Sequence, residues 1–281
     1  MPFKIMREFA SHEIIIEPKR AWIAFQWKEL WRYRELLRFL TVRDIKVRYK
    51  QTVLGGLWAI LQPFMSMVVF TIFFGMLAKI PSDNLPYPIF VYTALLPWQF
   101  FSNGISNAGN SLVASSHLIS KVYFPRIIIP AASLGAGLLD FLIAFSILIV
   151  MMLYYGIFPG MGILLLPFLM LMIVIAALGV GMILSALNVA YRDFRYVIPF
   201  LVQFWLFATP VIYPASIVPE NWRWLINLNP MAGLISAFRS SLLNTPILWN
   251  DLLISGAVSI VLFILGISYF TRMERRFADI I

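Results

Sequence analysis

The chain of 281 residues contains no cysteine and only two histidines. Without a thiol it can form neither a disulfide bond nor a thiolate metal site, and it has no cysteine nucleophile. His12 and His117 stand far apart and lack the spacing of paired metal ligands. We therefore expect no metal and no cofactor to bind this chain.

Charged residues are also scarce, at 12% of the chain, whereas 61% of the residues are hydrophobic. Between Arg126 and Arg192 lie 65 residues with one ionisable side chain, Asp140. A helix needs about 20 apolar residues to cross a hydrocarbon core of roughly 30 Å. This run therefore predicts two crossings and an integral membrane protein, whose function concerns what passes through the bilayer.

The sequence offers no energy source of its own. No lysine is followed by serine or threonine, so the phosphate loop G-x-x-x-x-G-K-[ST] that holds ATP is absent. Carriers driven by protons or sodium usually need several ionisable groups within the membrane, and the long apolar run has one. Energy for any pumping is expected to arrive through the cytoplasmic surface, from a partner.

Uncharged segments predict an all-α polytopic membrane protein with six transmembrane helices. Proline and glycine at residues 155–162 divide the longest run into two spans. The predicted spans are residues 51–78, 88–113, 128–154, 163–187, 196–213 and 252–271. The predicted parts are a cytoplasmic N-terminal segment at 1–50, a transmembrane domain at 51–271 and a cytoplasmic tail at 272–281.

Basic residues predict the orientation. Residues 1–50 alone hold 12 of the 22 lysines and arginines, and only Lys79, Arg223 and Arg239 fall on the opposite side of the predicted spans. Basic residues collect on the cytoplasmic side of membrane proteins, so both termini are expected in the cytoplasm at the plasma (bacterial inner) membrane. The first 20 residues have no apolar run of signal-peptide length. The net charge of +9 then requires no nucleic-acid partner.

An amphipathic helix is predicted at residues 21–40, before the first span. Apolar residues recur there at spacings of three and four, and charged residues occupy the opposite face. Trp22, Trp27 and Trp31 suit the headgroup zone. The helix either anchors the chain at the cytoplasmic interface, braces a partner subunit, or does both.

A short helical hairpin is predicted between the last two spans. The apolar stretches at residues 222–227 and 231–243 are too short to cross a membrane, and Asn229 and Pro230 form the turn between them. We expect a re-entrant hairpin in the outer leaflet. The alternative is an external amphipathic loop.

Four motifs, in order along most of the chain, resemble those of the membrane subunits of ABC-2 type exporters, specifically the polysaccharide-export permeases. They are TVRDIKVRYK at residues 41–50 with LGGLW at 54–58 and QP at 62–63, YFPRIIIP at 123–130, NVAYRDFR at 188–195 with ATPVIYP at 208–214, and WLINLNP at 224–230 with FR at 238–239.

This resemblance implies a homodimer of six-span permeases above two separately encoded nucleotide-binding ATPase subunits, which hold ATP and Mg²⁺. The substrate it implies is a lipid-linked polysaccharide, such as an O-antigen, capsule or teichoic acid chain, exported from the cytoplasm. The chain is then a transport subunit and not an enzyme. The alternatives are an ABC-2 exporter of lipids or drugs, a membrane glycosyltransferase and a passive channel.

The cytoplasmic loops are expected to couple the permease to the ATPase. Apolar residues on the short loop between spans two and three suit a groove on the partner, although they could instead fold onto the membrane surface. The second cytoplasmic loop and residues near the first span are further candidates, with a solvated, orientation-setting loop as the alternative. The predicted coupling residues are Leu118, Ile119, Lys121, Val122, Tyr123, Phe124, Tyr191, Arg192, Asp193, Arg43 and Asp44.

Aromatic side chains are the candidates for a glycan path, because sugar rings stack on aromatic faces; lipid-facing and interfacial positions are the alternative. The candidates are Trp58, Phe64, Phe70 and Phe74 in span one and Phe200, Phe204, Trp205 and Phe207 in span five. Asp140 either contacts a hydrated path or is a hydrogen-bonded structural group. Asn229, Pro230 and Arg239 are expected to shape an outer gate.

Overall fold

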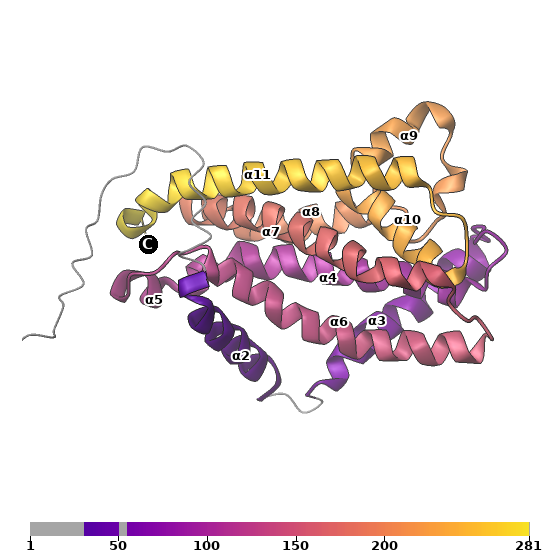
Figure 1. Cartoon of the computed structure of the whole chain (residues 1–281), viewed down its shortest axis with the longest axis horizontal. Helices are drawn as coiled ribbons and strands as arrows, with labels where there is room; N and C mark the ends of the chain where they lie inside the picture. Colours follow the sequence, from indigo (N-terminus) through magenta and orange to yellow (C-terminus); the bar gives the residue numbers. More distant parts are fainter. Residues whose placement is uncertain (1–30, 51–54, 281) are drawn as a thin grey trace, which may run out of the picture.

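The computed structural model describes residues 31–50 and 55–280, and all regular structure in this part of the chain is helical (Figure 1). The elements are α2 (Arg34–Lys50), α3 (Leu57–Phe70), the π-helix η1 (Thr71–Leu77), α4 (Tyr87–Ala114), α5 (Ser116–Lys121), α6 (Ile128–Tyr154), the 3-10 helix η2 (Met161–Leu165), α7 (Leu166–Ala190), α8 (Phe194–Phe207), the 3-10 helix η3 (Ala215–Ile217), α9 (Glu220–Asn227), α10 (Pro230–Leu243) and α11 (Trp249–Ile280). The predicted all-α class is confirmed for the described residues.

Four helical segments are long and apolar enough to cross a membrane. They are Leu57–Leu77, Ile128–Tyr154, Met161–Ala190 and Trp249–Glu274. They correspond to the predicted spans one, three, four and six, and the bounds of α6 are those predicted from the sequence. The chain is therefore an integral membrane protein. The helix α11 continues past the predicted end of the last span, to Ile280.

The other two predicted spans differ from these four. The helix α4 has 28 residues, close to the predicted bounds, but its glutamine, asparagine and serine residues keep its hydropathy below that of the four apolar segments. The helix α8 has 14 residues, or about 21 Å at 1.5 Å per residue, which is shorter than the hydrocarbon core. The predicted span at 196–213 was too long, because the helix ends at Phe207 and turns follow. The count of six spans stays a prediction.

The helix α4 lies in the middle of the bundle. It packs against α3, α6, α7, α8 and α10, and Figure 1 shows it running between α6 and α7. The side chains of Phe90, Tyr92 and Phe101 are fully buried. The hydroxyl of Tyr92 donates a hydrogen bond to the carbonyl oxygen of Ala144, at 3.1 Å. Five of the described helices are thus arranged around one largely buried helix.

The N-terminal helix α2 extends further than the sequence predicted. It continues to Lys50, ten residues past the expected end at residue 40. Residues 21–30 of the predicted amphipathic helix, with Trp22 and Trp27, lie outside the described residues, and Trp31 is exposed. The helix packs against α6, where Thr41 lies so close to Gly135 that a Cβ there would meet it at 3.0 Å.

Both helices of the predicted hairpin are present. α9 and α10 flank the turn at Asn229, where the asparagine side chain accepts a hydrogen bond from the backbone N–H of Met231 at 3.0 Å and so caps α10. The helix α10 is almost entirely buried, against α4, α7 and α11, whereas α9 is mostly exposed. Their depth in the membrane stays a prediction.

The helices α7 and α11 make the most extensive helix contact of the described bundle, and their backbones come very close. A Cβ atom on Gly266 would lie 2.3 Å from the carbonyl oxygen of Gly179, and a Cβ on Gly179 would lie 2.7 Å from the backbone of Phe263. Small residues allow membrane helices to come this close. Any larger side chain at either glycine must separate the two backbones.

We expect Gly266→Ala to lower the free energy of unfolding by about 1–3 kcal/mol, because the added methyl group overpacks the α7–α11 contact. Thermal unfolding of the purified protein in detergent would measure the change. Gly256→Ala in the same helix is the control, because a Cβ there meets nothing within 4 Å, and alanine favours a helix by about 1 kcal/mol over glycine. Equal effects of the two variants would contradict the prediction.

Candidate functional site

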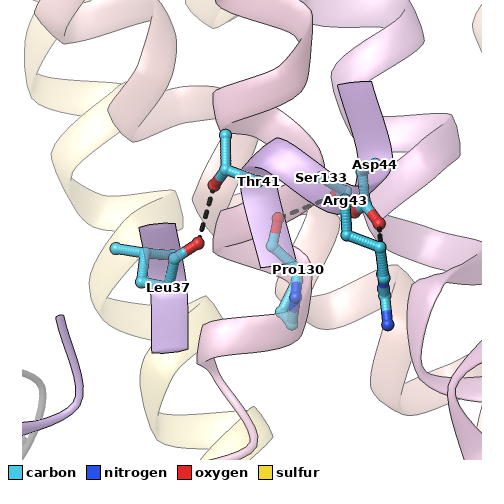
Figure 2. A network of polar contacts seen from close by, with 6 residues as sticks. All are labelled: Leu37, Thr41, Arg43, Asp44, Pro130 and Ser133. Carbon is cyan, nitrogen blue, oxygen red and sulfur yellow. Dashed lines mark hydrogen bonds and ion pairs between the residues drawn. The ribbon is translucent and has the colours of Figure 1, made fainter. Parts of the chain in front are cut away.

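Polar residues of α2 lie against the start of α6. Figure 2 shows the Thr41 hydroxyl donating to the carbonyl oxygen of Leu37 at 2.9 Å, and the guanidinium of Arg43 bound to the carboxylate of Asp44 at 2.8 Å. The Arg43 and Asp44 side chains are 40% and 26% exposed. Both predicted coupling residues therefore bind one another, at the surface of a helix that is held on α6.

Asp140 is anchored by the neighbouring helix. Its carboxylate accepts a hydrogen bond from the hydroxyl of Tyr49 and forms an ion pair with the guanidinium of Arg48, both near the end of α2. A carboxylate in an apolar span requires such partners. The sequence leaves the role of Asp140 open between a structural group and a path residue. The two contacts hold the end of α2 on α6, and Asp140 also borders a cavity of about 360 Å³ between α3, α4 and α6.

The predicted coupling residues on the loop between α4 and α6 fall into two groups, one buried and one exposed. Ile119 and Phe124 are 6% and 4% exposed and belong to a hydrophobic cluster that includes Leu40 of α2. Val122 and Tyr123 are 52% and 79% exposed. The expectation that all these apolar residues meet a partner was too broad, because the buried pair fastens the loop to its own chain. Leu118 is half-buried and Lys121 is exposed.

The same loop is attached to the C-terminal end of α11, and no pattern in the sequence predicts this attachment. The carboxylate of Glu274 accepts a hydrogen bond from the backbone N–H of Arg126 at 2.9 Å, and its carbonyl oxygen accepts one from the Arg126 guanidinium. The Arg126 guanidinium also lies 5.8 Å from the centre of the Phe277 ring. Figure 1 places α5 and this end of α11 at one end of the molecule.

The second predicted coupling loop is exposed. Tyr191, Arg192 and Asp193 are all accessible. Among the described residues Arg192 forms no ion pair, and Asp44 pairs with Arg43. Arg192 instead lines a cavity of about 660 Å³ at the ends of α4 and α7, together with Arg195.

The predicted path aromatics do not converge on one surface. Trp58 borders the cavity beside Asp140. Phe70 and Phe74 contact one another and pack against the core, and Phe64 lies on α3 at 39% exposure. Of the candidates on α8, Phe200, Phe204 and Phe207 are exposed.

Trp205 has a different role from the other α8 aromatics. Its ring meets that of Phe101 edge to face at 5.1 Å, and its indole N–H donates to the side-chain oxygen of Asn229 at 2.9 Å. The amide of Asn229 also donates to the Thr209 hydroxyl at 2.8 Å and to the carbonyl oxygen of Ala208 at 3.2 Å. Asn229, beside Pro230 at the first position of α10, thus joins the end of α8 to the start of α10.

Arg239, the third predicted gate residue, is 7% exposed. Its guanidinium donates to the carbonyl oxygens of Phe90 at 3.2 Å and of Pro210 and Val211 at 3.1 Å each, and it stacks on the Phe90 ring at 3.7 Å. These bonds explain why α8 ends early, because the carbonyls after Phe207 bind Arg239 and Asn229 instead of continuing a helix.

Within residues 31–50 and 55–280, no group of three or more histidine, aspartate or glutamate side chains could hold a metal ion. Most of the polar groups named above bind one another or line the two cavities. The buried hydroxyls of Thr71 and Ser241 have no hydrogen-bond partner among the described residues.

We expect Arg239→Met to lower the free energy of unfolding by about 3 kcal/mol, because several buried carbonyl oxygens lose their donor. The midpoint of thermal unfolding in detergent checks this. Arg223→Met is the matched control, since Arg223 is exposed on α9. A variant at 239 as stable as that control would show that the buried guanidinium is dispensable.

Comparison with known proteins agrees with the motifs. Residues 35–243 match the family described as ABC-2 type transporter. The chain is 31% identical over 251 residues to an O-antigen export system permease protein RfbA of Klebsiella pneumoniae. The aligned part covers 88% of this chain and 95% of that protein. It is 32% identical to a protein of the same description from Myxococcus xanthus, over 90% of this chain and 97% of that one.

A more distant relative is a polysialic acid transport protein KpsM of Escherichia coli, 24% identical over 73% of this chain and 80% of that protein. The family match covers well over half of the sequence and includes the α4–α6 loop, the α7–α8 loop and α10. The resemblance inferred from the four motifs is thereby confirmed, and this chain belongs to the ABC-2 type transporter family as a membrane permease.

Proposed function

We propose that this permease exports a lipid-linked polysaccharide, similar to an O-antigen, from the cytoplasm across the plasma membrane. The observation that carries this proposal is about 30% identity to O-antigen export permeases over nearly the whole chain. The exported chain is pushed by ATP hydrolysis in a separate subunit, because this sequence has no phosphate loop.

The working assembly is a homodimer of six-span subunits above two nucleotide-binding subunits. The exposed apolar residues of η1 and α8, which include Phe73, Met76, Phe200 and Phe204, support this assembly because they leave apolar surface for a second copy. The passage for the glycan lies between the two permeases. ATP and Mg²⁺ belong to the partner subunits.

Coupling to the ATPase runs through the α4–α6 loop. Its buried residues Ile119 and Phe124 hold the loop on the bundle, while Val122 and Tyr123 remain exposed for a partner. The exposed loop at Tyr191 to Asp193 forms a second contact, and the Arg43–Asp44 pair on α2 a third. Attachment of the first loop to Glu274 carries its displacement into the bundle.

The orientation follows from the basic residues, with both termini in the cytoplasm. α5 and the C-terminal end of α11 then lie at the cytoplasmic end, and α9 and α10 lie at the outer end (Figure 1). There the hairpin re-enters the outer leaflet and shapes an outer gate. The bonds of Asn229 and Arg239 support this proposal, because they hold α10 against α8 and the turns that follow it.

Depletion of the permease tests the exported substrate. We expect loss of surface glycan together with accumulation of lipid-linked polymer in the cytoplasm, which gel separation of extracted glycolipids would measure. Normal surface glycan in depleted cells would contradict the proposal. Loss of lipid or drug export in its place would favour another ABC-2 exporter.

A second experiment tests the coupling loop, and the absence of native cysteine makes it direct. We expect Tyr123→Cys to form a crosslink with a cysteine on the ATPase subunit in the assembled complex, because that side chain is 79% exposed. Tyr154→Cys, 83% exposed at the opposite end of α6, is the control. Crosslinking of the control alone, or of neither variant, would count against this coupling contact.

A further inference from the structure

Three carboxamide side chains stand in register on the central helix. Gln99, Asn103 and Asn107 are spaced four residues apart on α4, so they lie on one face of the helix. Most of α4 is buried, yet Asn103 and Asn107 are exposed and Gln99 is half-buried. This face is therefore the polar, accessible side of an otherwise enclosed helix.

These carboxamides differ from the other polar groups of α4. The hydroxyl of Ser106 donates to the carbonyl of Ser102, and the amide of Asn110 donates to the carbonyl of Ser106, each at 2.8 Å. The amide of Asn188 donates to the side chain of Asn110 at 3.1 Å, which joins that level to α7.

By contrast, within the part of the chain that the structure describes, no hydrogen-bond partner is found for the side chains of Gln99, Asn103 and Asn107. Polar groups that face hydrocarbon without partners are strongly unfavourable. Their face of α4 must therefore meet water, a ligand or another polar surface.

The three carboxamides line the cavity of about 360 Å³ beside Asp140. This volume falls within the range of about 300–1,000 Å³ that is usual for small-molecule sites. Across the cavity, α3 contributes the carboxamide of Gln62 and the ring of Trp58. Gln62 likewise has no hydrogen-bond partner among the described residues. Four free carboxamides and one aromatic ring thus face a single space.

The charges on the cavity wall indicate which class of ligand the cavity can bind. Arg48 and Asp140 both border it, and they form an ion pair with one another. Their charges offset each other, so the wall presents neutral hydrogen-bonding groups. Each carboxamide offers two donors and one acceptor oxygen, which matches hydroxyl groups that both donate and accept. A neutral polyhydroxylated ligand fits this set better than an ion or a hydrocarbon chain.

We propose that the cavity lined by Gln62, Gln99, Asn103 and Asn107 binds a neutral sugar unit of the exported glycan, with Trp58 against the sugar ring. This inference rests on the proposed function and adds a site to it. Because neutral carboxamides hold hydroxyl groups by exchangeable hydrogen bonds, successive sugar units can replace one another at the site. The binding groups are therefore amides of α4 and α3, and the exposed rings of α8 are not required for this contact.

Thiol protection tests the site in the complete complex. Asn103→Cys would be the single cysteine of the permease, assembled with a cysteine-free form of its ATPase subunits in lipid nanodiscs. The probe is the lipid-linked glycan extracted from permease-depleted cells, and the comparison is the same lipid carrier without glycan. We expect the rate of maleimide labelling to fall about five- to tenfold at a glycan concentration of about four to nine times its dissociation constant, because the bound sugar covers the thiol. The rate should stay constant with the carrier alone.

Ser146→Cys provides the matched control. Ser146 is exposed on α6, six residues beyond Asp140, and does not line the cavity. Its labelling should not change with either probe. Equal labelling of Asn103→Cys with and without glycan, in a complex that still exports glycan, overturns the sugar site and leaves the proposed function standing. Oxidative crosslinking between two Asn103→Cys chains also overturns it, because a second copy of the chain then fills the face.

A second pair of variants separates binding from folding. Asn107→Leu keeps the number of side-chain heavy atoms and their branched shape but removes the donors and acceptor, and Asn107→Ser keeps a hydrogen-bonding group. We expect the leucine variant to export glycan about five- to tenfold more slowly, at unchanged amounts of assembled complex, and the serine variant to be impaired less. Equal export by both variants overturns the proposal.

Discussion

A polar group inside an apolar bundle must find its partner within the protein, because the surrounding hydrocarbon supplies none. This requirement explains the most specific contacts of the permease. Arg239 donates to carbonyls from two separate segments, and Asn229 binds both a side chain and the backbone at the end of α8. Each bond is local, yet together they fix how α4, α8 and α10 meet. On α4 the amide of Asn110 donates a hydrogen bond to a backbone carbonyl, whereas the side chain of Asn103 is exposed.

The sequence predicted the parts of the fold that follow from chain-local properties. The span at 128–154 and the two short helices around Asn229 depend on apolar length and on proline position, and the structure has them there. The family could also be recognised from the sequence, because its short motifs occur in order along the chain. In contrast, the end of α8 was misplaced, since apolar residues after Phe207 resemble a continuing span.

Contacts between distant segments could not be read from the sequence. Asp140 clearly needed a partner, but nothing in the pattern distinguished Arg48 from the other basic residues near the first span. Glu274 gave no signal of its attachment to Arg126, 148 positions earlier. The α4–α6 loop also could not be predicted in detail, because Phe124 is buried and the adjacent aromatic residue Tyr123 is exposed. Such differences in exposure depend on which helix packs against each residue, and only the folded structure shows this packing.

The length of α11 has a mechanical consequence. Its 32 residues span about 48 Å, and both of its ends are fastened. Near its start, the carboxylate of Asp251 accepts a bond from Asn227 of α9 at 2.7 Å, and near its other end Glu274 holds the α4–α6 loop. Between these two ends, the backbone at Gly266 lies against that of Gly179 in α7. A displacement at one end of α11 can therefore reach the other end through a single continuous helix.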